Sequence, residues 1–304
     1  MKRKIIVFFI LLFILVLSSP NSEDLTTKVT EDKIEEKEED YKTVRVLKED
    51  KIVDLELEDY IIGVVSCEMP ASFNYEALKA MAVAARTYVL YKMKGNKEYD
   101  LTSTTKDQCY IDNEQMKYKW GNQYDKYYNI VSDAVYQTSG EYLTYNDEVI
   151  LSLYFSISNG YTENSENVFS QKLNYLVSVD SSWDSKYSYK IQTKEISIRE
   201  FLSKLDINDY KIRDIKIERY DTGRVKEIII NDKKYNGTKF RSLLGLRSTD
   251  FNITYNYDTV TIETKGYGHG VGMSQYGANV MANEGKKYDE ILKYYYTGVE
   301  LVHN

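Results

Sequence analysis

The chain has 304 residues, of which 42% are hydrophobic and 29% are charged, a balance typical of soluble globular proteins. Its formal net charge is -7 and no basic stripe runs along the sequence, so nucleic acid is excluded as the main partner. About 260 residues remain once a leader and a charged linker are set aside, which is enough for one large domain or two small ones.

The start of the chain has the pattern of an export signal. Basic residues at positions 2–4 precede an unbroken apolar run at positions 5–17, the order found at the start of exported chains. The run is shorter than the roughly 20 residues that span a bilayer, but no clean Ala-x-Ala cleavage site follows it, so we favour a retained anchor over a cleaved signal peptide. The acid-rich stretch at 21–42 predicts a solvated linker. The sequence is thus divided into an anchor or signal (1–20), this linker and one folded domain (43–304) on the extracytoplasmic side of the membrane.

The folded domain is expected to begin with a β-hairpin at 44–55 and two helices. Acidic residues at the start of the first helix suit its positive end, and Pro70 should end this helix at or before Met69. The second helix should run from about Asn74, a residue favoured at N-caps, to about Lys94.

The rest of the chain is richer in strand patterns. Strands are expected at 141–144, 149–157, 212–217, 225–230, 251–255 and 259–264. Two short helices near 274–283 and 288–296 should close the chain, with Gly285 and Gly298 as caps. Helices and strands are partly segregated along the chain, which indicates an α+β fold.

Cys67 and Cys109 are the two cysteines of the chain. They cannot make a structural zinc site by themselves, because there is no Cys-x-x-Cys pair and neither His269 nor His303 is near them in sequence. A disulfide between them is compatible with an exported chain, although the sequence alone does not establish it. We expect no metal and no other cofactor.

Glu68 lies at the end of the first predicted helix. Helical steps back along the chain reach Val64, Ile61 and Leu57, so the carboxyl should project from the buried face. Apolar surroundings and the negative end of the helix both disfavour the ionised form. A carboxyl that stays protonated near neutral pH suits a general acid. The alternative, equally compatible with the spacing, is a buried structural Glu paired with Arg86.

A glycine-rich segment, Gly266–Ala278, follows a predicted strand and opens a predicted helix. Its glycines do not match the dinucleotide-binding pattern and no Lys-Ser/Thr pair follows, so both nucleotide-binding fingerprints fail. The alternating glycines instead indicate backbone that lies close against a ligand or against another strand. With a ligand, the segment would present the polar side chains of His269, Ser274, Gln275 and Tyr276 to sugar hydroxyls. Without one, it is a tight strand-to-helix corner.

The segment Tyr154–Thr162 is a predicted strand that ends in a polar turn. Asn159-Gly160 can adopt the positive φ of a turn, and Ser158 precedes it. The pattern is weak on its own, and Ser158 and Asn159 are substrate-binding candidates only in combination with the other segments.

Taken together, these segments resemble the stage II sporulation protein D family of lytic transglycosylases. The similar stretches are 63–71 (GVVSCEMPA) and 76–88 (EALKAMAVAARTY) for its opening signature, 237–246 in the middle, and 268–278 (GHGVGMSQYGA) and 291–298 (ILKYYYTG) for its closing one. The similarity covers roughly 44–302, and the two end signatures are too long and specific for a chance match.

The resemblance implies cleavage of the β-1,4 bond between N-acetylmuramic acid and N-acetylglucosamine in peptidoglycan strands during engulfment of the forespore, with 1,6-anhydromuramic acid ends as products. It implies one N-terminal tether in the septal or engulfing membrane, and membrane-bound engulfment partners that include an amidase. It places the catalytic acid on Glu68 and puts His269, Ser274 and Gln275 near the cleft. Arg86 would either orient the acid or serve the fold.

Two positions depart from the family pattern. Some relatives hold zinc with a Cys/His cluster near the position of Cys109, whereas the stretch 106–110 contains no His, so the resemblance does not extend to zinc. The family more often has a small apolar residue before the glutamate. Cys67, which stands there in this chain, is interpreted as a packing residue.

Three other functions stay open at this point. A lysozyme-type hydrolase would need a second carboxylate, for which Glu163, Glu166 and Glu263 are candidates. A cysteine peptidase would use Cys67 with His269, but Cys67 lies at a helix C-terminus, the wrong end to stabilise a thiolate. A glycan-binding scaffold without catalysis has no evident need for a lone acid on an apolar helix face.

Overall fold

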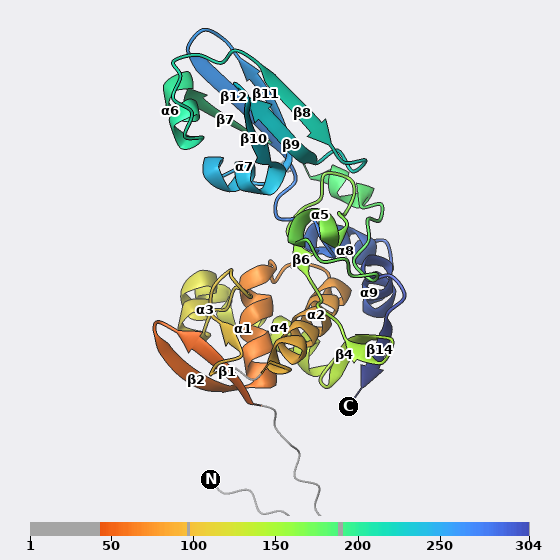
Figure 1. Ribbon diagram of the computed structural model, residues 1–304. Coiled ribbons are helices and arrows are strands. Elements are labelled where there is room, and N and C mark those ends of the chain that lie inside the picture. The colour runs from red at the N-terminus through yellow and green to blue at the C-terminus, as the bar shows by residue number, and fades with distance from the viewer. Residues whose placement is uncertain (1–42, 96–97, 188–190, 304) are drawn as a thin grey trace, which may run out of the picture. The chain divides into compact units, whose positions relative to one another are not determined.

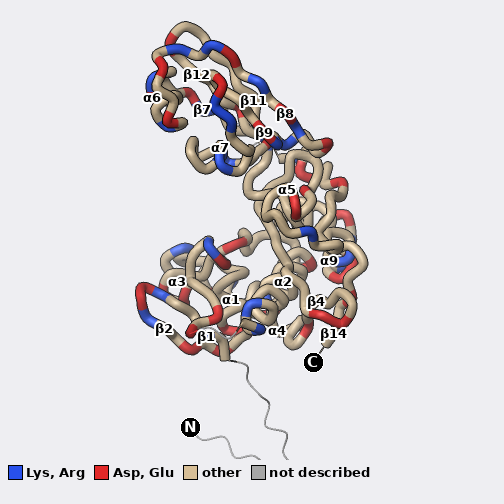
Figure 2. The backbone as a smooth tube through the Cα atoms, in the orientation of Figure 1, with Lys and Arg blue, Asp and Glu red and all other residues tan. Residues whose placement is uncertain are grey.

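The computed structural model describes residues 43–95, 98–187 and 191–303 (Figure 1). They form a mixed body of helices and sheets, which confirms the predicted α+β class. Acidic and basic residues are interspersed along the described backbone (Figure 2), in keeping with the lack of a basic stripe in the sequence.

Internal contacts separate the chain into Met1–Asp40 and Tyr41–Asn304. The anchor expected at 1–20 and the linker expected at 21–42 lie outside the described residues. Within the described ranges, no helix has both the length and the apolar character needed to span a bilayer.

A first hydrophobic core is formed by segments from both ends of the domain. Its elements up to residue 169 are β1 (Thr43–Lys48), β2 (Lys51–Glu56), α1 (Leu57–Glu68), α2 (Tyr75–Met93), β3 (Leu101–Thr102), α3 (Asn113–Trp120), η1 (Gly121–Gln123), α4 (Tyr124–Tyr136), β4 (Glu141–Tyr145), β5 (Glu148–Val149), β6 (Tyr154–Phe155) and α5 (Ser165–Phe169). Its later elements are η2 (Ser182–Lys186), β13 (Met273–Ser274), α8 (Gln275–Asn283), α9 (Tyr288–Tyr295) and β14 (Glu300–His303). α2 contacts α1, α4, α8 and α9, and its residues 77–89 are buried except for Lys79.

Local sequence sets the turn between α1 and α2. Met69 has extended backbone, with φ -119° and ψ 147°, so α1 ends directly before Pro70 as predicted. The side chain of Asn74 accepts a hydrogen bond from the Glu76 amide at 3.0 Å, which confirms the predicted N-cap. This turn leaves Glu68 as the last residue of α1.

A second hydrophobic core lies within residues 191–265. Its elements are β7 (Ile191–Ser197), α6 (Ile198–Lys204), β8 (Ile215–Arg219), β9 (Val225–Ile230), β10 (Lys233–Asn236), α7 (Gly237–Leu244), β11 (Asp250–Tyr255) and β12 (Thr259–Lys265). The strands form two three-stranded sheets, in the orders β10-β9-β8 and β11-β12-β7. Phe240 of α7 is fully buried and in ring contact with Phe201 of α6 and Phe251 of β11.

The single long strand predicted at 149–157 is wrong, since only the short strands β5 and β6 form there. Between them the chain runs across α2, and the Ser152 hydroxyl donates a hydrogen bond to the Ala84 carbonyl at 2.7 Å. Because the bonds of this stretch are divided among α2, β4 and β13, no continuous ladder forms with one neighbouring strand.

The glycine-rich segment packs against the chain around β6, with β13 and β6 paired in parallel. Gly268 has a φ of 113°, and a Cβ there would lie 2.7 Å from the Cβ of Phe155. Gly272 has a φ of 77°, and a Cβ there would lie 2.0 Å from the Leu153 carbonyl oxygen. The alternating glycines therefore serve the close approach of another backbone segment, which was one of the two explanations predicted.

Candidate active site

Glu68 is half-buried at the C-terminus of α1. Its Oε1 accepts a hydrogen bond from the backbone N–H of Cys109 at 2.8 Å, and its Oε2 accepts one from Nε2 of Gln275 at 3.1 Å. Val64 and Ile61, one and two helical turns earlier, are fully buried. The carboxyl thus lies on the apolar side of α1, with one donor for each oxygen.

Burial raises the pKa of the Glu68 carboxyl above its ordinary value. The Cys109 amide, the Gln275 side chain and the charge of Lys119 each favour the ionised form and oppose this shift, but the net direction is upward. The pKa of Glu68, the residue predicted from its position on the helix, is therefore shifted in the direction that a general acid requires.

Gln275 reaches Glu68 from the far end of the domain. It is the first residue of α8, whose N-cap is Ser274, with the Ser274 hydroxyl accepting a hydrogen bond from the Gly277 amide at 3.2 Å. The pairing of β13 with β6 fixes the chain directly before this helix. Of the four polar residues proposed in the glycine-rich segment, Gln275 is the one with a side-chain hydrogen bond to Glu68.

Cys67 and Cys109 form a disulfide, with their Cα atoms 5.6 Å apart. The interpretation of Cys67 as a packing residue is therefore wrong, and the disulfide that the sequence left open is the one present. A disulfide-bonded Cys67 also offers no thiolate for a cysteine peptidase. Such a bond persists in oxidising compartments, where an exported chain would lie.

Lys119 is a residue of the site that was missed in the sequence. Lys119 belongs to α3. Its Nζ donates a hydrogen bond to the Ser66 carbonyl at 2.7 Å and lies 3.4 Å from the Cys67 carbonyl oxygen. Burial lowers the pKa of Lys119, and the neighbouring charge of Glu68 opposes that change. The one available signal was the capping box at 112–115, which begins α3 and could have revealed this helix.

Comparison with known proteins identifies the family. A family model described as stage II sporulation protein matches residues 47–145. The chain is 43% identical over 258 residues to stage II sporulation protein D of Bacillus subtilis (strain 168), an alignment that covers 82% of this chain and 75% of that protein. The chain belongs to the stage II sporulation protein D family.

Two further relatives extend this comparison. Stage II sporulation protein D of Bacillus amyloliquefaciens is 42% identical over 259 residues, with 82% of this chain and 75% of that protein covered. A protein of Bacillus subtilis (strain 168) named amidase enhancer is 30% identical over 295 residues, which is 79% of this chain and 40% of that protein.

Arg86, for which a role in orienting the acid and a role in the fold were both open, is bound to a different carboxylate. Its Nε and Nη2 donate to the two oxygens of Glu58 at 2.8 and 2.6 Å, and it also donates to the carbonyls of Glu141 and Val135. Arg86 is 1% exposed. The alternative in which Arg86 pairs with Glu68 is therefore wrong, because Arg86 is already bound to Glu58 and to two backbone carbonyls.

Ser158 and Ser274 lie together, but they bind Asp184. Their hydroxyls donate to the Asp184 carboxylate at 2.7 and 2.9 Å, and Ser181 adds a third bond at 2.8 Å. All four side chains are fully buried, and this burial raises the pKa of Asp184. The cluster anchors the start of α8, so these two serines support the position of Gln275.

Asn159 and Tyr276 also have contacts within the fold. The Asn159 amide donates to the Thr222 carbonyl and to Asp250, both at 2.8 Å, so it joins the loop after β6 to the second core. The Tyr276 ring makes edge contacts with Phe73, at a centroid distance of 4.9 Å, and with Tyr187, at 4.7 Å.

His269 packs between aromatic rings. Its centroid lies 5.9 Å from that of Phe155 and 5.3 Å from that of Phe169, and its Nδ1 accepts a hydrogen bond from the Val271 amide at 3.1 Å. Burial, aided by the charge of Arg241, lowers the pKa of His269 to about 4. At neutral pH this ring is uncharged, and it is held by the Val271 amide and by the rings of Phe155 and Phe169.

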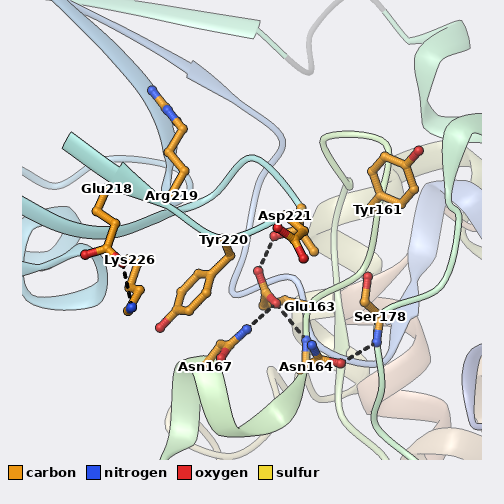
Figure 3. Close-up of a pocket in the computed structure, with 11 residues that line it drawn as sticks. Tyr161, Glu163, Asn164, Asn167, Ser178, Glu218, Arg219, Tyr220, Asp221 and Lys226 are labelled. Atoms are coloured by element: carbon orange, nitrogen blue, oxygen red, sulfur yellow. Dashed lines mark hydrogen bonds and ion pairs between the residues drawn. The ribbon is translucent and has the colours of Figure 1, made fainter.

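A polar pocket of about 530 Å³ is lined by residues of the 161–178 segment and of the β8–β9 hairpin, and Glu68 is not among them (Figure 3). Glu163, buried at its edge, accepts hydrogen bonds from the Asn164 amide at 2.9 Å, from Asn167 at 2.8 Å and from the Thr222 hydroxyl. The Thr222 bond ties the β8–β9 hairpin to the 161–178 segment.

Proposed function

We propose that this protein is a lytic transglycosylase. It would cleave the β-1,4 bond between N-acetylmuramic acid and N-acetylglucosamine in peptidoglycan and leave 1,6-anhydromuramic acid ends, in the engulfment step of sporulation. The observation that carries the proposal is the Glu68 carboxyl, which has a raised pKa and one hydrogen-bond donor on each oxygen. Membership of the stage II sporulation protein D family supports the substrate class and the biological setting.

In the proposed reaction, protonated Glu68 donates its proton to the glycosidic oxygen as the bond to the anomeric carbon breaks. The departing sugar leaves as an alcohol, and the muramic acid carries an oxocarbenium-like charge. The Cys109 amide and Gln275 then stabilise the Glu68 carboxylate that has formed. That carboxylate takes the proton of the muramic acid 6-hydroxyl, whose oxygen closes the 1,6-anhydro ring. The acid is thereby regenerated.

A single carboxyl is sufficient for this cycle because the nucleophile belongs to the substrate. A hydrolase would need a second carboxylate that activates water. Glu163, one candidate for that role, is buried and already accepts three hydrogen bonds within the fold. Among the residues that the structure describes, the charged side chain that shifts the pKa of Glu68 is Lys119, which is a cation and not a second carboxylate. Both points favour the transglycosylase over the hydrolase.

The proposal includes a location and partners. An N-terminal anchor would hold the domain on the extracytoplasmic side of the septal or engulfing membrane, and the Cys67–Cys109 disulfide supports an oxidising environment. An amidase is the proposed partner, as suggested by the related protein named amidase enhancer.

The test is mass spectrometry of glycan strands without stem peptides after incubation with the full chain. Products that end in 1,6-anhydromuramic acid are the expected result. Reducing ends would instead indicate a hydrolase. Intact strands that nevertheless bind the folded protein would favour the non-catalytic scaffold.

Replacing Lys119 should move the pH dependence of this reaction. The rate requires protonated Glu68, so kcat/KM falls as the pH rises through the pKa of that carboxyl. Lys119 lowers this pKa, so Lys119→Met should raise it and move the alkaline limb of the profile to higher pH. Lys119→Arg keeps the charge and should leave the limb near its original position. Superimposable profiles for all three proteins would contradict this role.

A further inference from the structure

The disulfide joins two residues that both adjoin the Glu68 carboxyl. Cys67 directly precedes Glu68 in α1, and the backbone N–H of Cys109 donates to Glu68 Oε1 at 2.8 Å. The bond links positions 42 residues apart in the sequence. The covalent link therefore runs from the helix end that carries the acid to the loop that supplies one of its two donors.

Regular secondary structure does not fix this donor. The stretch 103–112 contains no helix or strand. Non-covalent contacts hold its other residues: Asp107 is paired with Lys92 at 2.6 Å, and the Tyr110 ring stacks on Tyr60 at a centroid distance of 5.2 Å. The Gln108 side-chain amide donates to the Ala85 carbonyl at 3.2 Å, and the Ile111 N–H donates to the Gly63 carbonyl of α1 at 3.4 Å. At Cys109 itself, the disulfide is the covalent bond that holds the backbone N–H against the end of α1.

We infer that Cys67 and Cys109 are positioning residues for the catalytic acid, and that reduction of their disulfide impairs catalysis while the domain remains folded. This inference rests on the proposed function for its effect on rate. The structural half, that the disulfide holds the Cys109 donor at Glu68, can be tested without any activity.

Loss of the Cys109 N–H as a donor should shift the pKa of Glu68 in one direction. The Cys109 N–H favours the carboxylate and lowers the pKa of Glu68, so releasing it should raise that pKa further. The other groups that act on Glu68 are Lys119 from α3, whose Nζ also lies 3.4 Å from the Cys67 carbonyl oxygen, and Gln275 from α8. Tyr60 of α1 and Tyr154 of β6 also lie near, but burial raises the pKa of each phenol, so both stay neutral while Glu68 titrates.

The experiment compares the full chain in its oxidised form, after reduction, and as the double variant Cys67→Ser/Cys109→Ser, which contains no titrating thiol. Glu68 is followed by carbon NMR of labelled glutamate and assigned with Glu68→Gln. We expect the titration of Glu68 to move to higher pH in the reduced protein and in the double variant. We expect kcat to fall about 10- to 100-fold with a smaller change in KM, and reoxidation to restore the wild-type protein.

Phe240→Leu provides the matched control, since it weakens the buried second core without contacting Glu68. It should lower the thermal midpoint and leave both the Glu68 titration and kcat unchanged below that midpoint. An unchanged Glu68 titration after reduction would overturn the inference, as would unfolding in the same step as reduction. If oxidised protein has no activity on glycan strands, the proposed function fails, while the NMR titration still decides whether the disulfide positions the carboxyl.

Discussion

Glu68→Gln should lower the rate of 1,6-anhydromuramic acid formation by about 10³-fold or more, since general acid–base catalysis contributes up to about 10⁴-fold. Glutamine has nearly the shape of glutamate and can still accept a hydrogen bond from the Cys109 amide, so the end of α1 should keep its structure. It has no proton to give and no charge with which to take one back. The measurement is the initial rate of product formation, quantified by mass spectrometry.

Glu148→Gln is the control for this variant. Glu148 is an exposed carboxylate on β5, paired with Lys94 on the surface, and its replacement should leave the rate unchanged. Binding of glycan strands should survive in Glu68→Gln, because binding requires no proton transfer. Full activity of Glu68→Gln would move the catalytic acid to another residue.

Arg86→Met should reduce the free energy of unfolding by about 3–5 kcal/mol, the cost of breaking a buried ion pair by removing one partner. The variant leaves the Glu58 carboxylate without its two-oxygen partner at the start of α1, and it removes one donor each from the carbonyls of Glu141 and Val135. Methionine fills a similar volume, so the loss reflects hydrogen bonds and charge more than packing. Urea unfolding followed by circular dichroism measures it.

Lys94→Met is the matched control, because its pair with Glu148 is exposed and should contribute little. Arg86→Lys keeps the charge but cannot form the bidentate pair with Glu58. Its free energy of unfolding should therefore lie between those of the wild type and Arg86→Met. If Arg86→Met unfolds at the wild-type urea concentration, the ion pair with Glu58 makes no net contribution. A folded but inactive Arg86→Met would instead return Arg86 to the catalytic site.

Local signals were sufficient to predict the helix that carries the acid. Pro70 and Asn74 mark the end of one helix and the start of the next, and the apolar spacing places Glu68 on the buried face. Each of these signals depends on residues within one or two helical turns. A short stretch of sequence is therefore sufficient to predict this helix and the buried position of Glu68.

The partners of these groups could not be predicted, because tertiary packing selects them. In the sequence, a pair of Arg86 with Glu68 is one open alternative, but the packing of α1 on α2 pairs Arg86 with Glu58. Gln275 is 207 residues from the acid that it contacts. Lys119 belongs to a helix whose apolar pattern is too weak to be recognised, with one buried residue.

Two adjacent polar side chains in the glycine-rich segment bind different partners, and their spacing in the sequence does not show this. Gln275 turns toward Glu68, while Ser274, the residue before it, turns to the buried Asp184. The sequence shows that polar groups gather there. It does not show which of them face a ligand and which face the interior.

Glu68 is the last residue of α1, and Gln275, whose side chain donates to it, is the first residue of α8. The carboxyl therefore lies near the negative end of one helix and the positive end of another. The C-terminus of α1 favours the neutral acid, whereas the N-terminus of α8 favours the anion, so the two influences partly cancel. In the proposed mechanism Glu68 must release a proton and recover it within one turnover. A carboxyl on which two helix ends act in opposite directions is less strongly biased toward either state than one at a helix C-terminus alone, and a weaker bias favours both halves of that cycle.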